Sequence, residues 1–267
     1  MIRLVATDLD GTLLEKDGTL PEDTFETIEK LFERGILFAA ASGRQYGNLV
    51  RLFKPVAERM AFVCENGAFC MAAGREAGSI AIPTETAHEI IADIEAKHMN
   101  LLISGKHTCY MLDRNRKYTD DITYRLRNTV TIISSVDDIN EPILKISGQI
   151  DTGVAEIAPD FLEKWGNKLT ATVSGRDWFD FTVANKGSGM ECLMQHMGLQ
   201  KEEVAAFGDN FNDESMLDLV GYPFIMEAAH PKLHKPHYTV CRNVIPVMRA
   251  IAQANGSFEQ ALRLLNE

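Results

Sequence analysis

Two carboxylates stand close together at the end of a short apolar run near the N-terminus. Residues 2–7 have the length and β-branched content of a strand buried on both faces, and they lead into Asp8, Asp10, Gly11 and Thr12. Ligands of open α/β sheets bind at the carboxyl ends of the strands. Along an extended backbone Asp8 and Asp10 point to one side. Such a pair either holds a divalent cation or divides into one ionised group and one that carries a proton.

The alternative is an acidic turn without chemistry, because Asp, Gly and Thr are ordinary turn residues. Gly11 lets the chain turn and leaves room for a ligand near the backbone in either case. The elements that follow must decide between the two interpretations.

Those elements alternate between strands and helices. Apolar residues at helical spacing predict a helix over residues 21–34, and buried strands are predicted at 36–41 and 61–64. After residue 185 the pattern resumes with a helix ending near Gly198, a strand at 204–207, a helix from about Asp213 and a strand near Phe224. This rhythm predicts a doubly wound, Rossmann-like parallel sheet.

Between residues 84 and 184 the pattern changes. A helix at 87–97 is followed by short strands at 101–104 and 108–112, and later segments alternate in polarity as in an antiparallel sheet with one open face. We therefore expect an inserted α+β domain over 84–184, and a discontinuous core domain formed by 1–83 and 185–267.

Composition excludes several classes of protein. The chain has 267 residues, enough for about two domains, and its net charge of −11 opposes binding to nucleic acid or anionic membranes. No apolar stretch reaches membrane-spanning length and no leader precedes the first strand, so a cytoplasmic protein is expected. Five scattered cysteines without a close pair predict reduced, mostly buried thiols instead of disulfides or a zinc site.

Polar clusters end the predicted core strands or begin a core helix, and in chain order they form a recognisable set. They are DLDGT at 8–12, SGR at 42–44, the lysine of NKGSG at 185–189, and GDNFND at 208–213. This set resembles the four motifs of the haloacid dehalogenase (HAD) superfamily. The position of the insertion, with ENGA at 65–68, is similar to the Cof-type phosphatases of subclass IIB, which implies the HAD fold with a C2B-type cap.

The resemblance implies a role for each motif residue. Asp8 is expected as the nucleophile, Asp10 as the acid and base, and Lys186 as a catalytic cation. Expected Mg²⁺ ligands are Asp8, Asp10 (through its backbone carbonyl), Asp209 and Asp213. Phosphate or substrate binding is expected from Thr12, Ser42, Gly43, Arg44, Asn66 and Asn212.

Each motif also has a structural interpretation. Lys186 could be a solvated lysine at a helix start, and Asp209 and Asp213 could simply cap the following helix. The histidines at 230, 234 and 237 lie in a proline-interrupted segment that favours a loop over a metal site.

One segment departs from the family pattern. Cof-type proteins commonly carry Met-Gly-Asn-Ala after the last core strand, whereas this chain has Met226, Glu227, Ala228 and Ala229, and the Gly-Val step expected near residue 245 is also missing. An inward glutamate would add negative charge at the phosphate. Either the loop follows another path or the substrate preference differs.

The favoured function is a Mg²⁺-dependent phosphatase for small phosphorylated metabolites, most of all sugar phosphates, acting as a monomer or weak homodimer. A phosphomutase of the same subclass is the first alternative, because the insertion carries arginines that could hold a second phosphate: Arg114, Arg116, Arg125, Arg127 and Arg176. A catalytically silent protein that binds a phosphorylated ligand is the second. The sequence does not identify the substrate, because cap loops set the specificity.

Overall fold

The chain builds two β-sheets with different patterns of strand pairing. The computed structural model describes residues 1–266. These divide into a first unit, made of Met1–Gly43, Leu49–Gly78 and the chain from Lys186 onward, and a second unit, made of Ser79–Asn185 with the short segment Arg44–Asn48. The inserted domain at 84–184 remains a prediction from the sequence.

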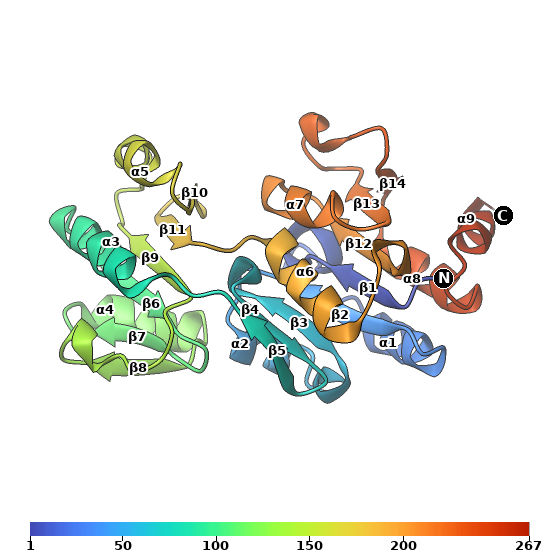
Figure 1. Cartoon of the computed structure of the whole chain (residues 1–267), viewed down its shortest axis with the longest axis horizontal. Coiled ribbons are helices and arrows are strands. Elements are labelled where there is room, and N and C mark those ends of the chain that lie inside the picture. Colours follow the sequence, from blue (N-terminus) through green and yellow to red (C-terminus); the bar gives the residue numbers. More distant parts are fainter. Residues whose placement is uncertain (267) are drawn as a thin grey trace. The chain divides into compact units, whose positions relative to one another are not determined.

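The first unit contains an eight-stranded sheet in the order β14-β13-β12-β1-β2-β3-β4-β5 (Figure 1). Pairing is parallel from β14 to β3, and β4 returns antiparallel to β3. The strands are β1 (Leu4–Thr7), β2 (Leu37–Ala41), β3 (Ala61–Cys64), β4 (Phe69–Ala72), β5 (Arg75–Ser79), β12 (Val204–Gly208), β13 (Tyr222–Met226) and β14 (Thr239–Cys241). The doubly wound α/β core is thus confirmed, with an antiparallel extension that the sequence did not predict.

Helices cover this sheet because its central strands are apolar on both faces. Those of the first unit are α1 (Thr24–Glu33), α6 (Lys186–Met197), α7 (Glu214–Leu217), α8 (Val244–Gln253) and α9 (Phe258–Asn266). Helix α2 (Tyr46–Leu52) is divided, because its residues 46–48 belong to the second unit. Helix α1 contacts β2 and α8, whereas α6 contacts β3, β4 and α7.

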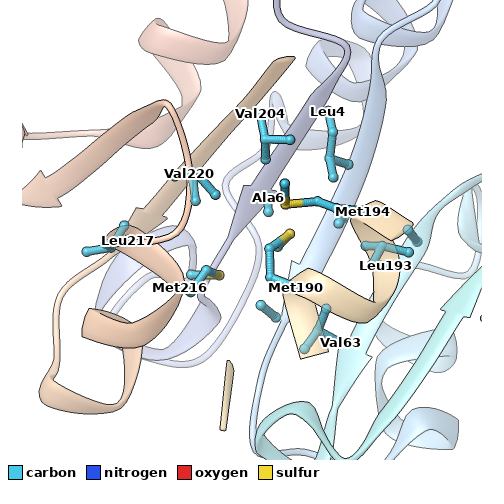
Figure 2. Packing of buried hydrophobic residues seen from close by; sticks show 14 of the residues in the cluster. Leu4, Ala6, Val63, Met190, Leu193, Met194, Val204, Met216, Leu217 and Val220 are labelled. Carbon is cyan, nitrogen blue, oxygen red and sulfur yellow. The ribbon is translucent and has the colours of Figure 1, made fainter. Parts of the chain in front are cut away.

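The side chains under α6 form a continuous apolar cluster. Figure 2 shows Met190 and Met194 of α6 beside Leu4 and Ala6 of β1 and Val204 of β12, and all five are buried. Small residues on the strands let the helix approach closely, and the unbranched methionines fill the remaining space. This packing fixes the position of the N-terminal turn of α6 relative to the ends of β1 and β12.

The second unit contains a six-stranded sheet in the order β10-β11-β9-β6-β7-β8. Its elements are α3 (Thr84–Ala96), β6 (Asn100–Ser104), β7 (Cys109–Leu112), α4 (Arg116–Asp120), β8 (Val130–Ile133), β9 (Lys145–Gln149), α5 (Ala158–Trp165), β10 (Thr170–Val173) and β11 (Trp178–Thr182). The expected antiparallel pairing is wrong at one place, because β7 and β8 are parallel.

The prediction that one face of this sheet is open is also partly wrong. Buried Tyr118 of α4 and Ile122 pack on Leu102 and Met111 on the side opposite the main apolar cluster. A helix and the turn after it therefore cover part of the second face.

Replacing Gly189 with alanine tests the close packing of α6. A Cβ there would lie 2.6 Å from the Gly67 Cα and from the Val63 Cγ1. We expect Gly189→Ala to lower the free energy of unfolding by about 1–3 kcal/mol, although alanine is the better helix former. Urea unfolding measures this, with the exposed Gln195→Ala in the same helix as control. A Gly189→Ala protein as stable as wild type would contradict the packing.

Candidate active site

Asp8 is fixed by the sheet, and Asp10 by the turn that follows it. The Asp8 backbone N–H donates to the Phe207 carbonyl at 2.9 Å, which continues the pairing of β1 with β12 by one residue. The turn Leu9–Leu13 then reverses the chain. Asp8 is only 6% exposed, whereas Asp10 is exposed. The two carboxylates thus lie in different environments, as two different roles require.

Gly11 fits the turn against Asp209. Its φ is 90°, and a Cβ at this position would lie 2.3 Å from Asp209 Oδ2. The Thr12 hydroxyl donates to Asp209 Oδ1 at 3.0 Å. Any side chain at position 11 would therefore displace Asp209. The neighbouring Asp209 carboxylate explains both the glycine at position 11 and the hydroxyl at position 12.

Lys186 begins α6 and is buried between two carboxylates. Its Nζ lies 2.5 Å from Asp8 Oδ1 and 2.5 Å from Asp213 Oδ1, and the lysine is 1% exposed. The first turn of the helix is fixed by Ser215, whose hydroxyl accepts the Gly187 N–H at 3.0 Å. Lys186 is therefore not a solvated lysine. The role of Ser215 in fixing the first turn of α6 was not predicted, because a serine at this spacing carries no distinct signal in the sequence.

Asp213 both closes its own loop and pairs with the lysine. Its Oδ2 accepts the backbone N–H groups of Asp209 and Asn210 at 3.0 Å each. A Cβ at Gly208 would lie 2.5 Å from the Asp213 Cβ, so the loop needs glycine there. One oxygen of Asp213 caps the turn and the other binds Lys186, and a role of Asp213 in holding a metal stays a prediction.

Burial shifts the pKa values of this group. Burial raises the pKa of Asp8 to about 7, although Lys186 acts in the opposite direction. Burial also raises the pKa of Asp209, and Asp213 adds to this effect. Burial alone would lower the pKa of Lys186, but the nearby Asp8 and Asp213 carboxylates outweigh it and the net shift is upward. Burial thus outweighs the single ammonium at Asp8 and Asp209, whereas the two neighbouring carboxylates outweigh burial at Lys186.

Asp8, Asp209 and Asp213 form one group that could hold a metal ion. Each offers a carboxylate oxygen, and these oxygens lie within 4.8 Å of one another. One ammonium does not balance three carboxylates in a largely buried place, and hard oxygen donors suit Mg²⁺. The residues therefore fit a divalent cation. The Asp10 carboxylate is not part of this group, and the contribution of the Asp10 backbone carbonyl stays a prediction.

Ser42, Gly43 and Asn66 form a second cluster at the same edge of the sheet. The Ser42 N–H donates to the Val63 carbonyl at 2.8 Å, and the Ser42 carbonyl accepts the Asn66 N–H at 3.1 Å. A Cβ at Gly43 would lie 3.1 Å from Asn66 Oδ1. Asn66 has a φ of 55°, an uncommon conformation for a non-glycine residue. The ends of β2 and β3 are thus locked together beside the end of β1.

Asn212 and Arg44 are placed differently from the other predicted residues. Asn212 is exposed in the short turn Phe211–Asp213, next to buried Asp213. Arg44 begins the segment Arg44–Asn48, which belongs to the second unit. Within that unit the side-chain Oε1 of Gln45 accepts the Thr129 N–H at 3.0 Å, and the side-chain amide of Asn48 donates to Asn128 Oδ1 at 2.7 Å.

The loop at 226–229, which differs from the family pattern, directs the Glu227 side chain outward. Glu227 is exposed and pairs with Arg242 at 2.9 Å, and its N–H donates to the Cys241 carbonyl at 2.8 Å. The loop therefore extends the pairing of β13 with β14, and the pairing with Arg242 neutralises the Glu227 charge.

The arginines considered for a second phosphate site pair with carboxylates beside them. Four such pairs are Arg114 with Glu95 at 2.6 Å, Arg116 with Asp120 at 3.0 Å, Arg125 with Asp121 at 2.5 Å, and Arg176 with Asp177 at 3.5 Å. Exposed pairs of this kind are common on solvated surfaces.

The histidine segment behaves as a loop. His230 Nδ1 accepts the Lys232 N–H at 3.2 Å and so caps the turn Pro231–Leu233. Within residues 1–266 no histidine joins a group that could hold a metal. The same residues contain no helix long and apolar enough to cross a membrane.

Comparisons with known proteins agree with this geometry. A family model described as haloacid dehalogenase-like hydrolase matches residues 5–244. The chain is 24% identical over 233 residues to the 5-amino-6-(5-phospho-D-ribitylamino)uracil phosphatase YbjI of Escherichia coli (strain K12), covering 85% of this chain and 86% of that protein. It is 27% identical over 263 residues to the HMP-PP phosphatase of Enterobacter sp. (strain 638), covering 91% and 92%.

Among solved structures, the HAD subclass IIB sugar phosphatase BT4131 has the same fold. The TM-score is 0.75 at 22% sequence identity, with 97% of this chain and 99% of that chain covered. The predicted family and enzyme class are confirmed together: the chain belongs to the haloacid dehalogenase-like hydrolase family and is a phosphoric monoester hydrolase.

Proposed function

We propose that this chain is a Mg²⁺-dependent phosphatase that hydrolyses small phosphorylated metabolites, with sugar phosphates the favoured class, through a phosphorylated Asp8. The observation that carries the proposal is Lys186, buried between Asp8 and Asp213 within a group of carboxylates that one ammonium does not neutralise. Such a group is suited to bind a cation and an anionic substrate together.

Electrostatics explain why Asp8 needs this environment. A phosphate monoester is an anion, and bringing a carboxylate within about 4 Å of it costs about 4 kcal/mol per charge pair at an effective dielectric constant near 20. Lys186 holds one oxygen of Asp8 and so reduces that repulsion. It also fixes the rotamer of Asp8, so the nucleophile is oriented before substrate arrives.

The metal would be held by Asp8 and Asp209, with the Asp10 carbonyl, and by Asp213 directly or through water. When bound, the ion supplies the positive charge that neutralises the phosphoryl oxygens. Thr12 holds Asp209 Oδ1, and the backbone N–H groups at 209 and 210 hold Asp213, so the ligand carboxylates are fixed by hydrogen bonds of their own.

Asp8 and Asp10 have separate roles in the reaction. The Asp8 carboxylate attacks phosphorus and the bond to the leaving oxygen breaks, while Asp10 donates a proton to that oxygen. Asp10 then takes a proton from the water that hydrolyses the acyl phosphate. The exposure of Asp10 suits this exchange of protons, because the leaving group and the water must both reach it.

The phosphoryl oxygens would be bound by the cluster at the ends of β2 and β3. Ser42 and the Gly43 backbone would donate to them, with Asn66 holding that turn in place. Asn212 and Thr12 would complete the contacts, and Arg44 would support the substrate.

The names of the relatives indicate the general class of substrate. Two of them are named for phosphorylated ribitylaminouracil and for HMP-PP, both small phosphorylated compounds. Four of the five arginines considered for a phosphomutase pair locally, which favours a solvated face over a second phosphate site there. Cytoplasmic location and a monomer or weak homodimer remain predictions from the sequence.

Removing the nucleophile tests the proposal. We expect wild-type protein to release phosphate from members of a panel of sugar phosphates, nucleotides and phosphorylated cofactors only when Mg²⁺ is present. Asp8→Asn should lose at least about 10³-fold in kcat/KM, because no covalent intermediate can form. Asp23→Asn, an exposed change in the same unit, is the control and should keep full activity. Turnover by Asp8→Asn at the control rate would disprove the role of Asp8.

Metal binding is tested without turnover. Calorimetric titration should show Mg²⁺ binding to wild-type protein, weakened at least about 10-fold in Asp209→Asn and unchanged in Asp23→Asn. The Asn side chain keeps an oxygen for the Thr12 hydroxyl, so the effect is one of charge. Equal affinity in all three proteins would place the ion elsewhere.

The lysine pair is tested through stability. Lys186→Met should lower the free energy of unfolding by about 3–5 kcal/mol, because it leaves buried carboxylates without a cation. Adding Asp8→Asn to Lys186→Met should restore part of this loss, whereas the exposed Lys201→Met should cost little. Urea unfolding of the single and double variants measures both effects. A double variant no more stable than Lys186→Met would contradict the charge argument.

A further inference from the structure

Two cysteines lie beside each other between helix α6 and the sheet of the first unit. Cys70 belongs to β4 and is 1% exposed, whereas Cys192 belongs to α6 and is partly exposed. Helix α6 contacts β4, and Cys192 packs against the apolar cluster that contains Cys70. Both thiols are free. The first unit therefore holds a pair of thiols from two elements that are far apart in the sequence.

The Cys70 side chain faces the helix. Strand pairing places Cys70 opposite Val63, and both residues belong to the cluster under α6. Cys64 follows Val63 in β3 and points to the other face of the sheet, because side chains alternate along a strand. The Cys70 Sγ donates to the Gly189 carbonyl of α6 at 3.2 Å. Cys192 lies three residues after Gly189, on the same side of the helix, and is thus the thiol that Cys70 faces.

The Cys192 thiol lies over a glycine at the edge of the sheet. A Cβ at Gly78 of β5 would be 2.5 Å from Cys192 Sγ, and β5 is the neighbour of β4. Gly78 therefore makes room for the sulfur. Because Cys192 keeps part of its surface exposed, a small oxidant can reach it, whereas the helix and the sheet shield Cys70.

The two thiols also differ in reactivity. Burial raises the pKa of Cys70, and Cys192 raises it further through its charge and through a hydrogen bond between the two thiols. Cys70 therefore stays protonated, and oxidants react with thiolates. Cysteines that respond to oxidants commonly combine one accessible sulfur with a second that completes the bond. Cys192 has the position of the first and Cys70 that of the second.

We propose that Cys70 and Cys192 form a disulfide when hydrogen peroxide oxidises Cys192, and that this bond slows the phosphatase. The Cys192 sulfur attacks the peroxide, the O–O bond breaks, and a sulfenic acid and one water form. The Cys70 sulfur then attacks the Cys192 sulfur, the S–O bond breaks, and the Cys70 proton leaves with the hydroxide as a second water. The two thiols lose two electrons, and the peroxide gains them.

The bond acts on the candidate active site through helix α6. A disulfide places its sulfur atoms about 2 Å apart, and it removes the hydrogen bond from Cys70 to the helix. The close packing at Gly189 leaves α6 no room to absorb the change locally. Lys186 begins the same helix, about 9 Å from Cys192 along its axis. A shift of α6 therefore displaces the Lys186 ammonium from Asp8, which it contacts at 2.5 Å. The loss of activity rests on the proposed phosphatase function, whereas the bond itself does not.

The test follows the bond and the activity separately. Wild-type protein is treated with hydrogen peroxide, alkylated, and digested with trypsin and a protease that cuts after Glu65, so that Cys64 and Cys70 fall on different peptides. We expect a linked pair of peptides that contains Cys70 and Cys192, lighter by two hydrogen atoms than the free peptides and separated by dithiothreitol. Phosphate release should fall at least about 10-fold and return with dithiothreitol, because small displacements of catalytic groups are costly.

Three variants control the experiment. Cys192→Ser should form no linked pair and should keep its phosphate release under peroxide. Cys70→Ser should also form none, and its hydroxyl can still donate to the Gly189 carbonyl, so the packing of α6 is retained. Cys241→Ser, which changes another buried thiol of the same unit, should behave as wild type.

Other outcomes overturn the inference. Oxidised wild-type protein without the linked pair would refute the bond, and a linked pair with unchanged phosphate release would refute the switch. Equal inactivation of Cys192→Ser and wild type would assign the effect to other residues. Reduced wild-type protein that releases no phosphate from any ester would refute the proposed function and with it the switch, while the linked pair would still decide the bond.

Discussion

A lysine ammonium buried between two carboxylates is the interaction on which the rest of this structure depends. Lys186 is 1% exposed and contacts Asp8, at the end of β1, and Asp213, in the turn after β12. A buried charge is tolerated only when its partners are held in good geometry. The parallel sheet supplies that geometry, because β1 and β12 are neighbours and end at the same edge. The glycines at 11 and 208 follow from it, since each makes room for a carboxylate of the group.

The same rule of charge balance describes the carboxylate group of the first unit. In the first unit the carboxylates are held by an ammonium, a hydroxyl and backbone N–H groups, and what remains unsatisfied is net negative charge, which suits a metal ion. In the second unit the buried Tyr118 hydroxyl has no hydrogen-bond partner among residues 1–266. The deficit of positive charge in the first unit fits a cation and a phosphoryl group.

Much of the core and its site could be predicted from the sequence, because the signals are local. Apolar runs ending in DLDGT, SGR and GDNFND marked the strand ends, and the sheet then brought Asp8, Lys186, Asp209 and Asp213 together. The antiparallel β4 and the parallel pairing of β7 with β8 were not predicted, because strand partners depend on tertiary contacts. The outward path of Glu227 depends on Arg242, which lies on another strand end. The Tyr118 hydroxyl gave no signal in the sequence, since burial without a partner becomes visible only in the fold.

The central claim is that Asp8 becomes phosphorylated during turnover. The direct measurement is to mix the protein with Mg²⁺ and a hydrolysed sugar phosphate, quench in acid, digest, and determine the mass of the peptide that contains Asp8. The account predicts a transient gain of one phosphoryl group on that peptide, absent from Asp8→Asn. Rapid phosphate release with an unmodified Asp8 peptide at every quench time would mean direct attack by water, and would contradict the account.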